Sequence, residues 1–429
     1  MTRANVGRRA VIRSMLLGGI GAAALSATAC APRRTIRVGV LHSLTGTMAV
    51  SETGVVDATL LALERLNAAG GLLGMAIEPV VVDGRSHWPT FAAEAERLIV
   101  SENVSVVFGC WTSASRKTVL PVFETHDHLL FYPVQYEGLE RSPNIVYLGA
   151  APNQQILPAV DWAVRRFGRR IYLAGSDYVF PRTANAIIRD QVLRFDQARD
   201  GVANIVGEGY RPLGDQDFSR MIFDIRRLQP DCVINTVNGD SNIGLFKGLT
   251  AAGLGPERQP IVSLSIGEPE IATMDGLAAG SYAAWNYFQS VATAENRGFV
   301  DAFRQRFGGE RVIGDPMEAA YTGVAIWARA VTAAASPDPR AVRAKLGGIA
   351  LPAPVGPVSV DAATQHLSKP VRIGRAQPGG QFEIVWESPG AVHPIPYPDT
   401  RTEAAWDDHL QRLRRRWNGE WAAASAGGG

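Results

Sequence analysis

Short, mostly apolar runs alternate with helix-like stretches along the first third of the chain. Residues 36–41, 77–82, 104–108 and 129–131 each form such a run, bounded by polar or small residues, which is the pattern of a buried strand. Between the second and third runs, apolar residues recur three and four positions apart, which is typical of an amphipathic helix. Repeated strand–helix units predict a parallel sheet with helices on both faces.

A second set of strand and helix patterns follows the first. Two successive α/β sets predict an α/β protein with two lobes that face each other across a cleft. The predicted elements of this set are strands 171–174, 203–210, 232–237 and 261–264 and helices 183–193 and 218–228.

The last third of the chain has helical patterns first and a hairpin pattern later. Between them, residues 352–360 are rich in proline and glycine, and we predict that they carry the chain back to the second lobe. The predicted elements are helices 297–307, 317–335 and 341–346 and a hairpin of strands 371–374 and 382–386.

The C-terminal tail carries an apolar stripe at helical spacing beside a run of arginines. We predict that this stripe docks a C-terminal helix on its own domain, and a membrane-surface or partner helix is the alternative. Residues 425–429 are predicted to be disordered. The stripe consists of Trp406, Leu410, Leu413, Trp417 and Trp421.

The composition is that of a globular protein with two domains. The chain has 429 residues, 46% of them hydrophobic, and a formal net charge of +2. This length exceeds the roughly 250–300 residues that one core usually supports. The small net charge argues against a nucleic-acid partner. Besides Cys30, the chain has Cys110 and Cys232 in or beside apolar runs, which predicts buried, unreactive thiols rather than a disulfide framework.

Residues 1–30 have the pattern of an export signal. Arginines precede the apolar stretch 15–24, which is too short to span a bilayer. Small residues before Cys30 resemble a lipoprotein cleavage site, so Cys30 is a predicted lipidation site. Arg8 and Arg9 also resemble a twin-arginine signal, and an ordinary secretory signal is the alternative. We therefore expect an exported protein of the periplasm or cell envelope that contacts the membrane only through a lipid anchor.

Aromatic and polar residues gather where two predicted strands end. Trp111, Thr112 and Ser113 follow one strand, and Tyr132 and Gln135 follow the next. In parallel sheets, ligands bind beyond the carboxyl ends of the strands, where helix N-termini present free N–H groups. Aromatic walls and several hydroxyl groups suit a small, planar, polar and uncharged ligand.

Four segments, at residues 109–117, 131–137, 149–155 and 175–182, together resemble the urea-binding proteins of bacterial ABC transporters. Those proteins are type I periplasmic binding proteins and are close to the short-chain amide sensor of the amidase operon. The resemblance extends over residues 36–398. It implies two Rossmann-like lobes joined by a hinge of three crossing strands, with the ligand cleft between the lobes.

The resemblance also implies how the chain divides into lobes. A C-terminal helix and disordered tail are expected to follow the second lobe. The expected parts are an N-terminal lobe at 36–150 and 287–350, a C-terminal lobe at 151–286 and 351–400, and the helix and tail at 401–429.

The function that the resemblance implies is that of a receptor. It binds urea, or a closely similar small amide, and delivers it to permease subunits in the inner membrane, without a cofactor. Urea needs flat aromatic walls, donors for its oxygen and acceptors for its N–H groups, and we expect Ser113 with nearby backbone N–H groups to donate and Glu268 to accept. The relatives have cleft-lining residues at the positions of Trp111, Ser113, Tyr132, Val134, Gln135, Tyr178 and Phe180.

Several alternatives remain open. A short-chain amide receptor fits less well, because the amide sensor has threonine and proline at the positions of Val134 and Gln135. A branched-chain amino-acid receptor needs an ammonium partner and a carboxylate clamp, and an amide-responsive sensor would not need an export signal. An exported amidohydrolase would need a nucleophile–base pair or a metal cluster, and the sequence has no such motif. His126 and His128 have no third histidine nearby, so we predict a solvated turn there.

Overall fold

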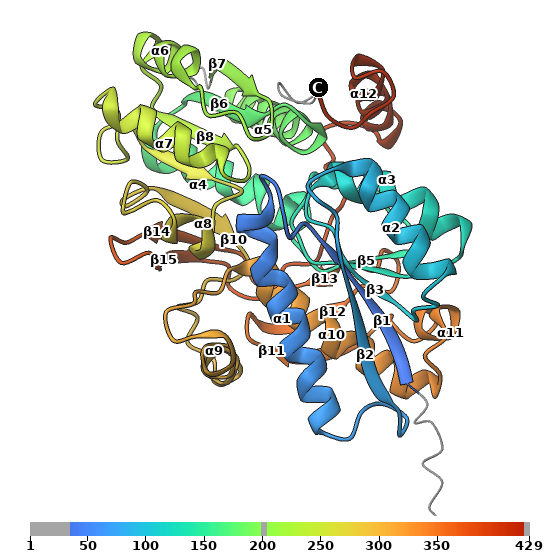
Figure 1. Cartoon of the computed structure of the whole chain (residues 1–429). Coiled ribbons are helices and arrows are strands. Elements are labelled where there is room, and N and C mark those ends of the chain that lie inside the picture. The colour runs from blue at the N-terminus through green and yellow to red at the C-terminus, as the bar shows by residue number, and fades with distance from the viewer. Residues whose placement is uncertain (1–34, 199–203, 424–429) are drawn as a thin grey trace, which may run out of the picture. The chain divides into compact units, whose positions relative to one another are not determined.

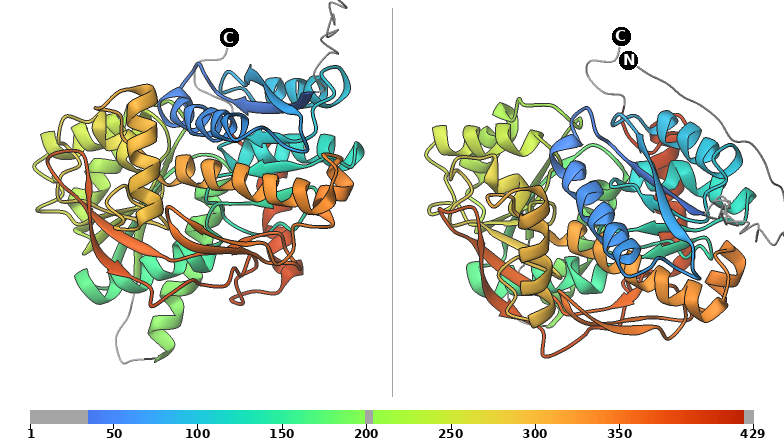
Figure 2. Two further views of the ribbon diagram at one scale, coloured as in Figure 1. Left: turned by 90° about the horizontal axis from the view of Figure 1, so that it is seen from below. Right: turned by 60° about the horizontal axis from the view of Figure 1, so that its bottom comes forward.

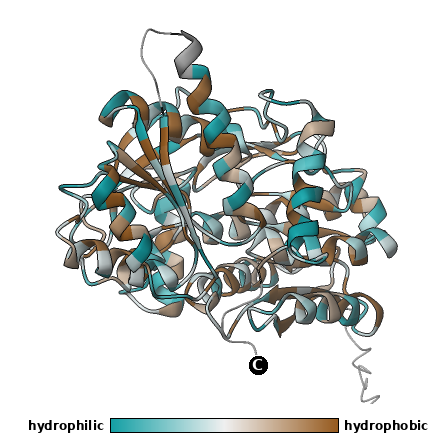
Figure 3. Ribbon diagram, turned by 90° about the horizontal axis from the view of Figure 1, so that it is seen from above, coloured by the Kyte–Doolittle hydropathy of each residue, from teal (hydrophilic) through white to brown (hydrophobic). Residues whose placement is uncertain are grey.

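The computed structural model describes residues 35–198 and 204–423, which form two lobes around two large sheets (Figure 1). The predicted export signal with Cys30, at residues 1–30, and the predicted disordered tail, at 425–429, lie outside the described residues. Hydrophobic residues are concentrated on the central strands of the lobes, and hydrophilic residues occupy the outer faces of the helices (Figure 3).

The first lobe contains a five-stranded parallel sheet in the order β2-β1-β3-β4-β5. Helix α1 packs with α10 on one face, and α2 packs with α3 on the other (Figures 1 and 2). The strands are β1 (Thr35–His42), β2 (Ala76–Asp83), β3 (Val107–Gly109), β4 (Leu130–Tyr132) and β5 (Ile145–Tyr147). The helices are α1 (Ala49–Ala68), α2 (Trp88–Val100), α3 (Ser113–Thr125), α9 (Ala294–Phe307), α10 (Asp315–Ala334) and α11 (Pro339–Arg343).

The second lobe contains a seven-stranded sheet in the order β15-β14-β10-β9-β8-β6-β7. Its strands from β6 to β10 are parallel, and the β14–β15 hairpin adds antiparallel strands at one edge, as predicted. The strands are β6 (Arg170–Ser176), β7 (Asn204–Arg211), β8 (Cys232–Thr236), β9 (Ile261–Ser263), β10 (Tyr282–Trp285), β14 (Arg372–Ala376) and β15 (Phe382–Glu387). The helices are η1 (Pro152–Gln154), α4 (Ile156–Phe167), α5 (Val179–Ala198), α6 (Ser219–Leu228), α7 (Ser241–Ala251) and α8 (Glu268–Ala272).

The chain passes between the lobes three times, after β5, after β10 and after β13. The predicted crossing at residues 352–360 is wrong. This segment forms strands β11 (Ala350–Ala353) and β12 (Gly356–Val360) of a three-stranded antiparallel sheet, completed by β13 (Leu367–Ser368). Its alternating apolar side chains pack in the core of the first lobe, so the chain crosses only after β13.

The C-terminal helix α12 (Glu403–Arg416) docks on α5 of the second lobe, as predicted. Its apolar stripe, from Trp406 to Trp417, belongs to the core of that lobe. Arg401 adds an ion pair with Asp190 of α5, with N–O distances of 2.6 and 2.8 Å. In the described part of the chain, no helix is both long and apolar enough to cross a membrane.

Candidate functional site

The carboxyl ends of β3 and β4 bring the predicted residues of the first lobe together. Cys110 follows β3 with a φ of 65°, an uncommon conformation for a residue other than glycine, and this turn directs the chain into α3. Thr112 caps α3, since its side chain accepts a hydrogen bond from Ser115 N at 3.0 Å. The N–H groups of Ser113 and Ala114 in the first turn have no intrahelical acceptor. They are backbone donors available to an anionic or carbonyl oxygen.

Three aromatic side chains of the prediction lie in this region, and all are buried. The Tyr132 hydroxyl donates to the carbonyl oxygen of Trp111 at 2.6 Å. Burial raises the pKa of Tyr178, and the nearby hydroxyl of Tyr132 contributes to the shift. The Tyr178 ring lies 6.3 Å from that of Phe180. Side chains from both lobes therefore meet at this point.

Ser113 is also buried here, but its hydroxyl is already engaged. It donates to Glu137 and accepts from Arg116 Nη1 at 3.1 Å. The single hydroxyl proton is thus used within the protein. The donors left for a ligand oxygen at this turn are the backbone N–H groups, rather than the Ser113 hydroxyl that the sequence suggested.

Behind Ser113 lies a buried cluster of charges. Arg116 Nε contacts Glu140 at 2.8 Å and its Nη2 contacts Glu137 at 3.2 Å, while Lys117 contacts Glu140 at 2.9 Å. Burial alone would raise the pKa of Glu140, but the charges of Arg116 and Lys117 outweigh it and lower the pKa to about 2. The guanidinium also lies 4.8 Å from the Tyr132 ring centre. This cluster holds the start of α3 and the ring of Tyr132 in place; these are here called the first-lobe wall.

Val134 and Gln135 lie at the crossing from the first lobe to the second. A Cβ atom on Gly149 would come within 2.0 Å of the Val134 carbonyl carbon, so only glycine permits this close approach. Gln135 Nε2 donates to the carbonyl oxygen of Leu264, just after β9, at 2.9 Å. Gln135 therefore links the two lobes, and its Oε1 atom is buried with no hydrogen-bond partner among the described residues.

Glu268 is buried, and its carboxyl group is hydrogen-bonded at the second crossing. Its Oε1 accepts from Gln289 N at 2.7 Å, and a Cβ atom on Gly314, at the start of α10, would lie 3.9 Å from its Oε2. Burial raises the pKa of Glu268 to about 8, with Asp315 adding to the shift. The sequence predicted that Glu268 accepts hydrogen bonds from the ligand. The structure places its carboxyl group beside the second crossing.

Two polar pairs of the cleft were not predicted. His42, at the end of β1, contacts Glu52 of α1 at 2.9 Å, and both side chains are buried. Ser51 donates to Glu270 of the second lobe at 2.6 Å. The sequence contains several hydroxyl residues in the turn after β1. The pattern of residues along α1 does not indicate whether the Glu52 side chain is buried or exposed to solvent.

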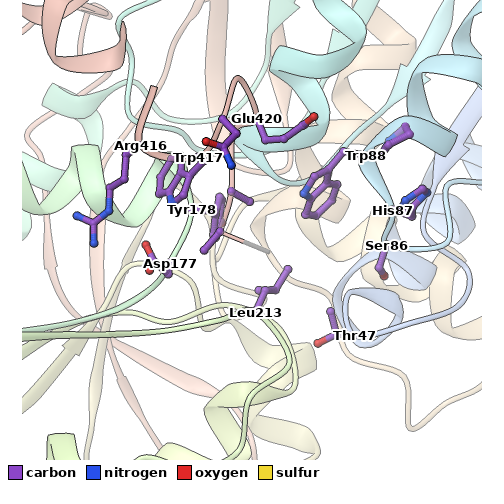
Figure 4. A pocket seen from close by; sticks show the side chains of 14 residues that line it. Thr47, Ser86, His87, Trp88, Asp177, Tyr178, Leu213, Arg416, Trp417 and Glu420 are labelled. Carbon is purple, nitrogen blue, oxygen red and sulfur yellow. The ribbon is translucent and has the colours of Figure 1, made fainter. Parts of the chain in front are cut away.

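A cavity of about 510 Å³, here called the outer pocket, lies beside the cleft (Figure 4). Of the predicted site residues, only Tyr178 lines it. The other predicted ligand-binding residues are buried and do not line this pocket. The lining residues include Thr47, Ser86, His87, Trp88, Asp177, Tyr178, Leu213, Arg416, Trp417, Glu420 and Ala423.

The C-terminal segment, residues 417–423, closes one side of the outer pocket. Val179 N donates to Trp421 O at 2.9 Å, and Ala423 N donates to Asp177 O at 3.0 Å. Lys117 of the first lobe lies 5.1 Å from the Trp421 ring centre. The segment therefore touches both lobes.

The two histidines that follow α3 have partners of their own. His126 Nε2 contacts Glu96 at 2.9 Å, and His128 Nε2 contacts the carbonyl oxygen of Val104 at 2.8 Å. His128 is buried, so the predicted solvated turn is wrong for this residue. Across residues 35–198 and 204–423, no group of three or more His, Cys, Asp or Glu side chains is arranged to hold a metal ion. Cys110 and Cys232 are free and buried, as predicted.

Comparison with known sequences identifies the family. The family described as periplasmic binding protein domain matches residues 36–403. A leucine-, isoleucine-, valine-, threonine- and alanine-binding protein of Pseudomonas aeruginosa is 23% identical over 335 residues, which are 76% of this chain and 86% of that protein. A limonene hydroxylase of Geobacillus stearothermophilus is 38% identical over 119 residues, or 28% of this chain. The chain spans 21% of that hydroxylase's length.

Solved structures share the fold at low sequence identity. A solute-binding protein of an ABC transporter from Rhodopseudomonas palustris, in complex with p-hydroxybenzoic acid, has a TM-score of 0.75 at 21% identity and covers 85% of this chain and 99% of its own. A branched-chain amino acid transporter substrate-binding protein from Streptococcus pneumoniae, in complex with isoleucine, has a TM-score of 0.70 at 20% identity and covers 84% of this chain and 100% of its own.

The family match covers most of the described chain, and the two-lobed fold agrees with it. Members of this family are solute-binding receptors of ABC transporters rather than enzymes, and they act outside the cytoplasm. The chain therefore belongs to the periplasmic binding protein family and is a substrate-binding receptor of an ABC transporter.

Proposed function

We propose that this receptor binds urea, or a closely similar small amide, between its lobes. The observation that carries the proposal is a set of buried polar atoms at the facing strand ends that have no partner in the described part of the protein. They are Trp111 Nε1 and Gln135 Oε1 in the first lobe and Ser265 Oγ in the second. Each such atom costs about 1–3 kcal/mol when it stays unpaired, so a small ligand with both donors and acceptors is favoured. Urea has a carbonyl acceptor and four N–H donors within a few ångströms.

The charges of the first-lobe wall favour a neutral ligand. The cations nearest to the aromatic group, Arg116 and Lys117, are already paired with Glu137 and Glu140. Neither cation is therefore free to hold a ligand carboxylate. The relatives named above were found with isoleucine and p-hydroxybenzoic acid, which both carry a carboxylate. A neutral amide suits this wall better, with the backbone N–H groups of Ser113 and Ala114 directed at its oxygen.

Delivery of the ligand would follow from closure of the lobes. Contacts to both lobes form only when the cleft is closed, so the ligand shifts the population toward the closed state. The closed receptor would present its ligand to permease subunits in the inner membrane. Export through the signal at residues 1–30 and acylation of Cys30 belong to this proposal, as do the lobe boundaries expected near residues 150 and 287.

A panel of ligands tests the proposal by thermal unfolding. A ligand that binds only the folded protein raises the melting temperature in proportion to the logarithm of its concentration. We expect urea at low millimolar concentration to raise the melting temperature, and leucine and p-hydroxybenzoate to leave it unchanged. Stabilisation by leucine alone would favour an amino-acid receptor, and stabilisation by acetamide alone would favour an amide receptor.

A further inference from the structure

The His42–Glu52 pair lies at the carboxyl end of β1, opposite the second lobe. Glu52 Oε2 accepts hydrogen bonds from Ser43 N at 2.8 Å and from His42 Nδ1 at 2.9 Å. The side chains of His42 and Glu52 are 0% and 1% exposed. Both are therefore fixed in place and removed from bulk water.

One atom of each side chain in this pair is left without a partner. Glu52 Oε1 and His42 Nε2 are buried and form no hydrogen bond with any described residue. Glu52 Oε2 already accepts two hydrogen bonds, so Oε1 is the acceptor of this carboxyl group that is left without a partner. The pair thus presents an unpartnered buried acceptor, which suits a ligand rich in N–H groups.

The pair lies next to the turn that carries the aromatic wall. Cys110 N donates to the carbonyl oxygen of Leu41, the residue before His42, at 2.9 Å. Burial raises the pKa of the Cys110 thiol, and the nearby Glu52 carboxylate raises it further. Trp111 follows directly in the chain. The neighbouring Ser51 contacts Glu270 of the second lobe, so this turn of α1 lies where the lobes meet.

We propose that Glu52 is a specificity-determining residue of the ligand cleft, which accepts an N–H group of the ligand and excludes ligands that carry a carboxylate. His42 is a positioning residue, because it holds one carboxylate oxygen and leaves the other for the ligand. A ligand carboxylate at this place would face a buried carboxylate, which is strongly unfavourable. This inference rests on the proposed function, since it assumes that the ligand is a small neutral amide.

The test compares Glu52→Gln with Glu64→Gln in the full-length protein. Glu64 lies on the same helix but is exposed and pairs with Arg306, so it is the matched control. Urea binding is measured by calorimetry, alone and with acetate as competitor. We expect Glu52→Gln to weaken urea binding by at least about tenfold and to let acetate compete, because the glutamine amide donates to a carboxylate. The wild type and Glu64→Gln should bind urea equally and ignore acetate.

Each other result would overturn the inference in a distinct way. Equal urea affinity in Glu52→Gln and Glu64→Gln would show that Glu52 does not contact the ligand. Weaker urea binding without acetate competition would assign Glu52 a structural role only. If Glu52→Gln does not fold, His42→Asn gives the answer, with an expected loss of about threefold or more and no acetate competition, and unchanged affinity would count against the pair. Wild-type protein that binds no urea would instead refute the proposed function, and the inference with it.

Discussion

Tyr132 connects the aromatic wall of the cleft with the buried charges behind it. Its hydroxyl holds the Trp111 carbonyl, while its ring lies over the guanidinium of Arg116. The ring and the hydroxyl therefore have separate roles. Under the proposed function, the ring would supply a flat face for a planar ligand, while the hydroxyl fixes the turn that leads into α3.

This separation predicts a graded response to substitution of Tyr132. We expect Tyr132→Ala to weaken urea binding by at least about tenfold, or about 1.4 kcal/mol, because the wall is lost. Tyr132→Phe keeps the ring and should cause a smaller loss. Tyr172→Phe is the control, since Tyr172 is buried in the second lobe and its hydroxyl has no hydrogen bond with the described residues. Calorimetric affinities that are equal for all variants would remove Tyr132 from the site.

The raised pKa of Glu268 leads us to predict that the stability of the protein depends on pH. Burial raises its pKa to about 8 from the ordinary value of 4.5, so the folded protein keeps this carboxyl protonated at neutral pH while the unfolded chain ionises it. Its contribution to stability is complete below about pH 4.5 and is lost as the pH rises through about 8. Glu268→Gln resembles the neutral form and should remove this loss.

The measurement is the melting temperature of wild type and Glu268→Gln between about pH 5 and about pH 8. The wild type should lose more stability over this range than the variant. Glu257→Gln, at an exposed position of the same lobe, should behave like the wild type. Identical pH profiles for wild type and Glu268→Gln would mean that Glu268 is ionised in the folded protein.

Helix α12 and the segment that follows it attach the C-terminus to both lobes. The helix packs on α5, and residues 417–423 pair with the backbone at Asp177 and Val179. Trp421 reaches Lys117 on α3 of the first lobe. Because these contacts join the two lobes, we expect this segment to favour the closed state.

We therefore expect Trp421→Ala to weaken urea binding by roughly threefold to tenfold without loss of the fold. The reason is that the closed state loses one contact, while the backbone pairing at Val179 remains. Trp386→Ala, at a partly exposed position of β15, is the control. An unchanged urea affinity in Trp421→Ala would show that the segment does not contribute to closure.

The elements with a strong local pattern could be predicted, and those with a weak one could not. The first four strands and the β14–β15 hairpin follow from apolar runs and turn residues. Strands β5 and β10 were not predicted. Helix α7 was missed because it begins in the polar turn after β8, which reads as a loop. Helix propensity and spacing carry little information in such short or mixed segments.

The site residues show the same limit. The proximity of Trp111 and Tyr132 could be predicted, because strand ends meet at one edge of a parallel sheet. Tyr178 follows β6 of the other sheet and was expected only from the family resemblance. The engagement of Ser113 with Glu137 and the burial of Glu52 could not be predicted, because both depend on contacts between residues that are apart in the sequence and lie on different elements. Glu268 follows a strand as expected, yet its contacts turn it toward the second crossing.

The two lobes are held together by polar contacts across the cleft. Thr47 donates to Asp240, Ser51 donates to Glu270 at 2.6 Å, and Gln135 donates to the backbone after β9 at 2.9 Å. These contacts join the strand ends of one lobe to those of the other, and the three crossings provide the hinge. In this arrangement, a ligand between the lobes would add its own contacts to both sides.

The central claim is that this receptor binds urea between its two lobes. Calorimetric titration of the protein with urea tests this claim most directly. The account predicts a saturable signal with one site and micromolar or tighter affinity, undiminished by leucine. No heat with urea, together with clear binding of leucine or another carboxylate ligand, would keep the fold and the receptor family but contradict the ligand.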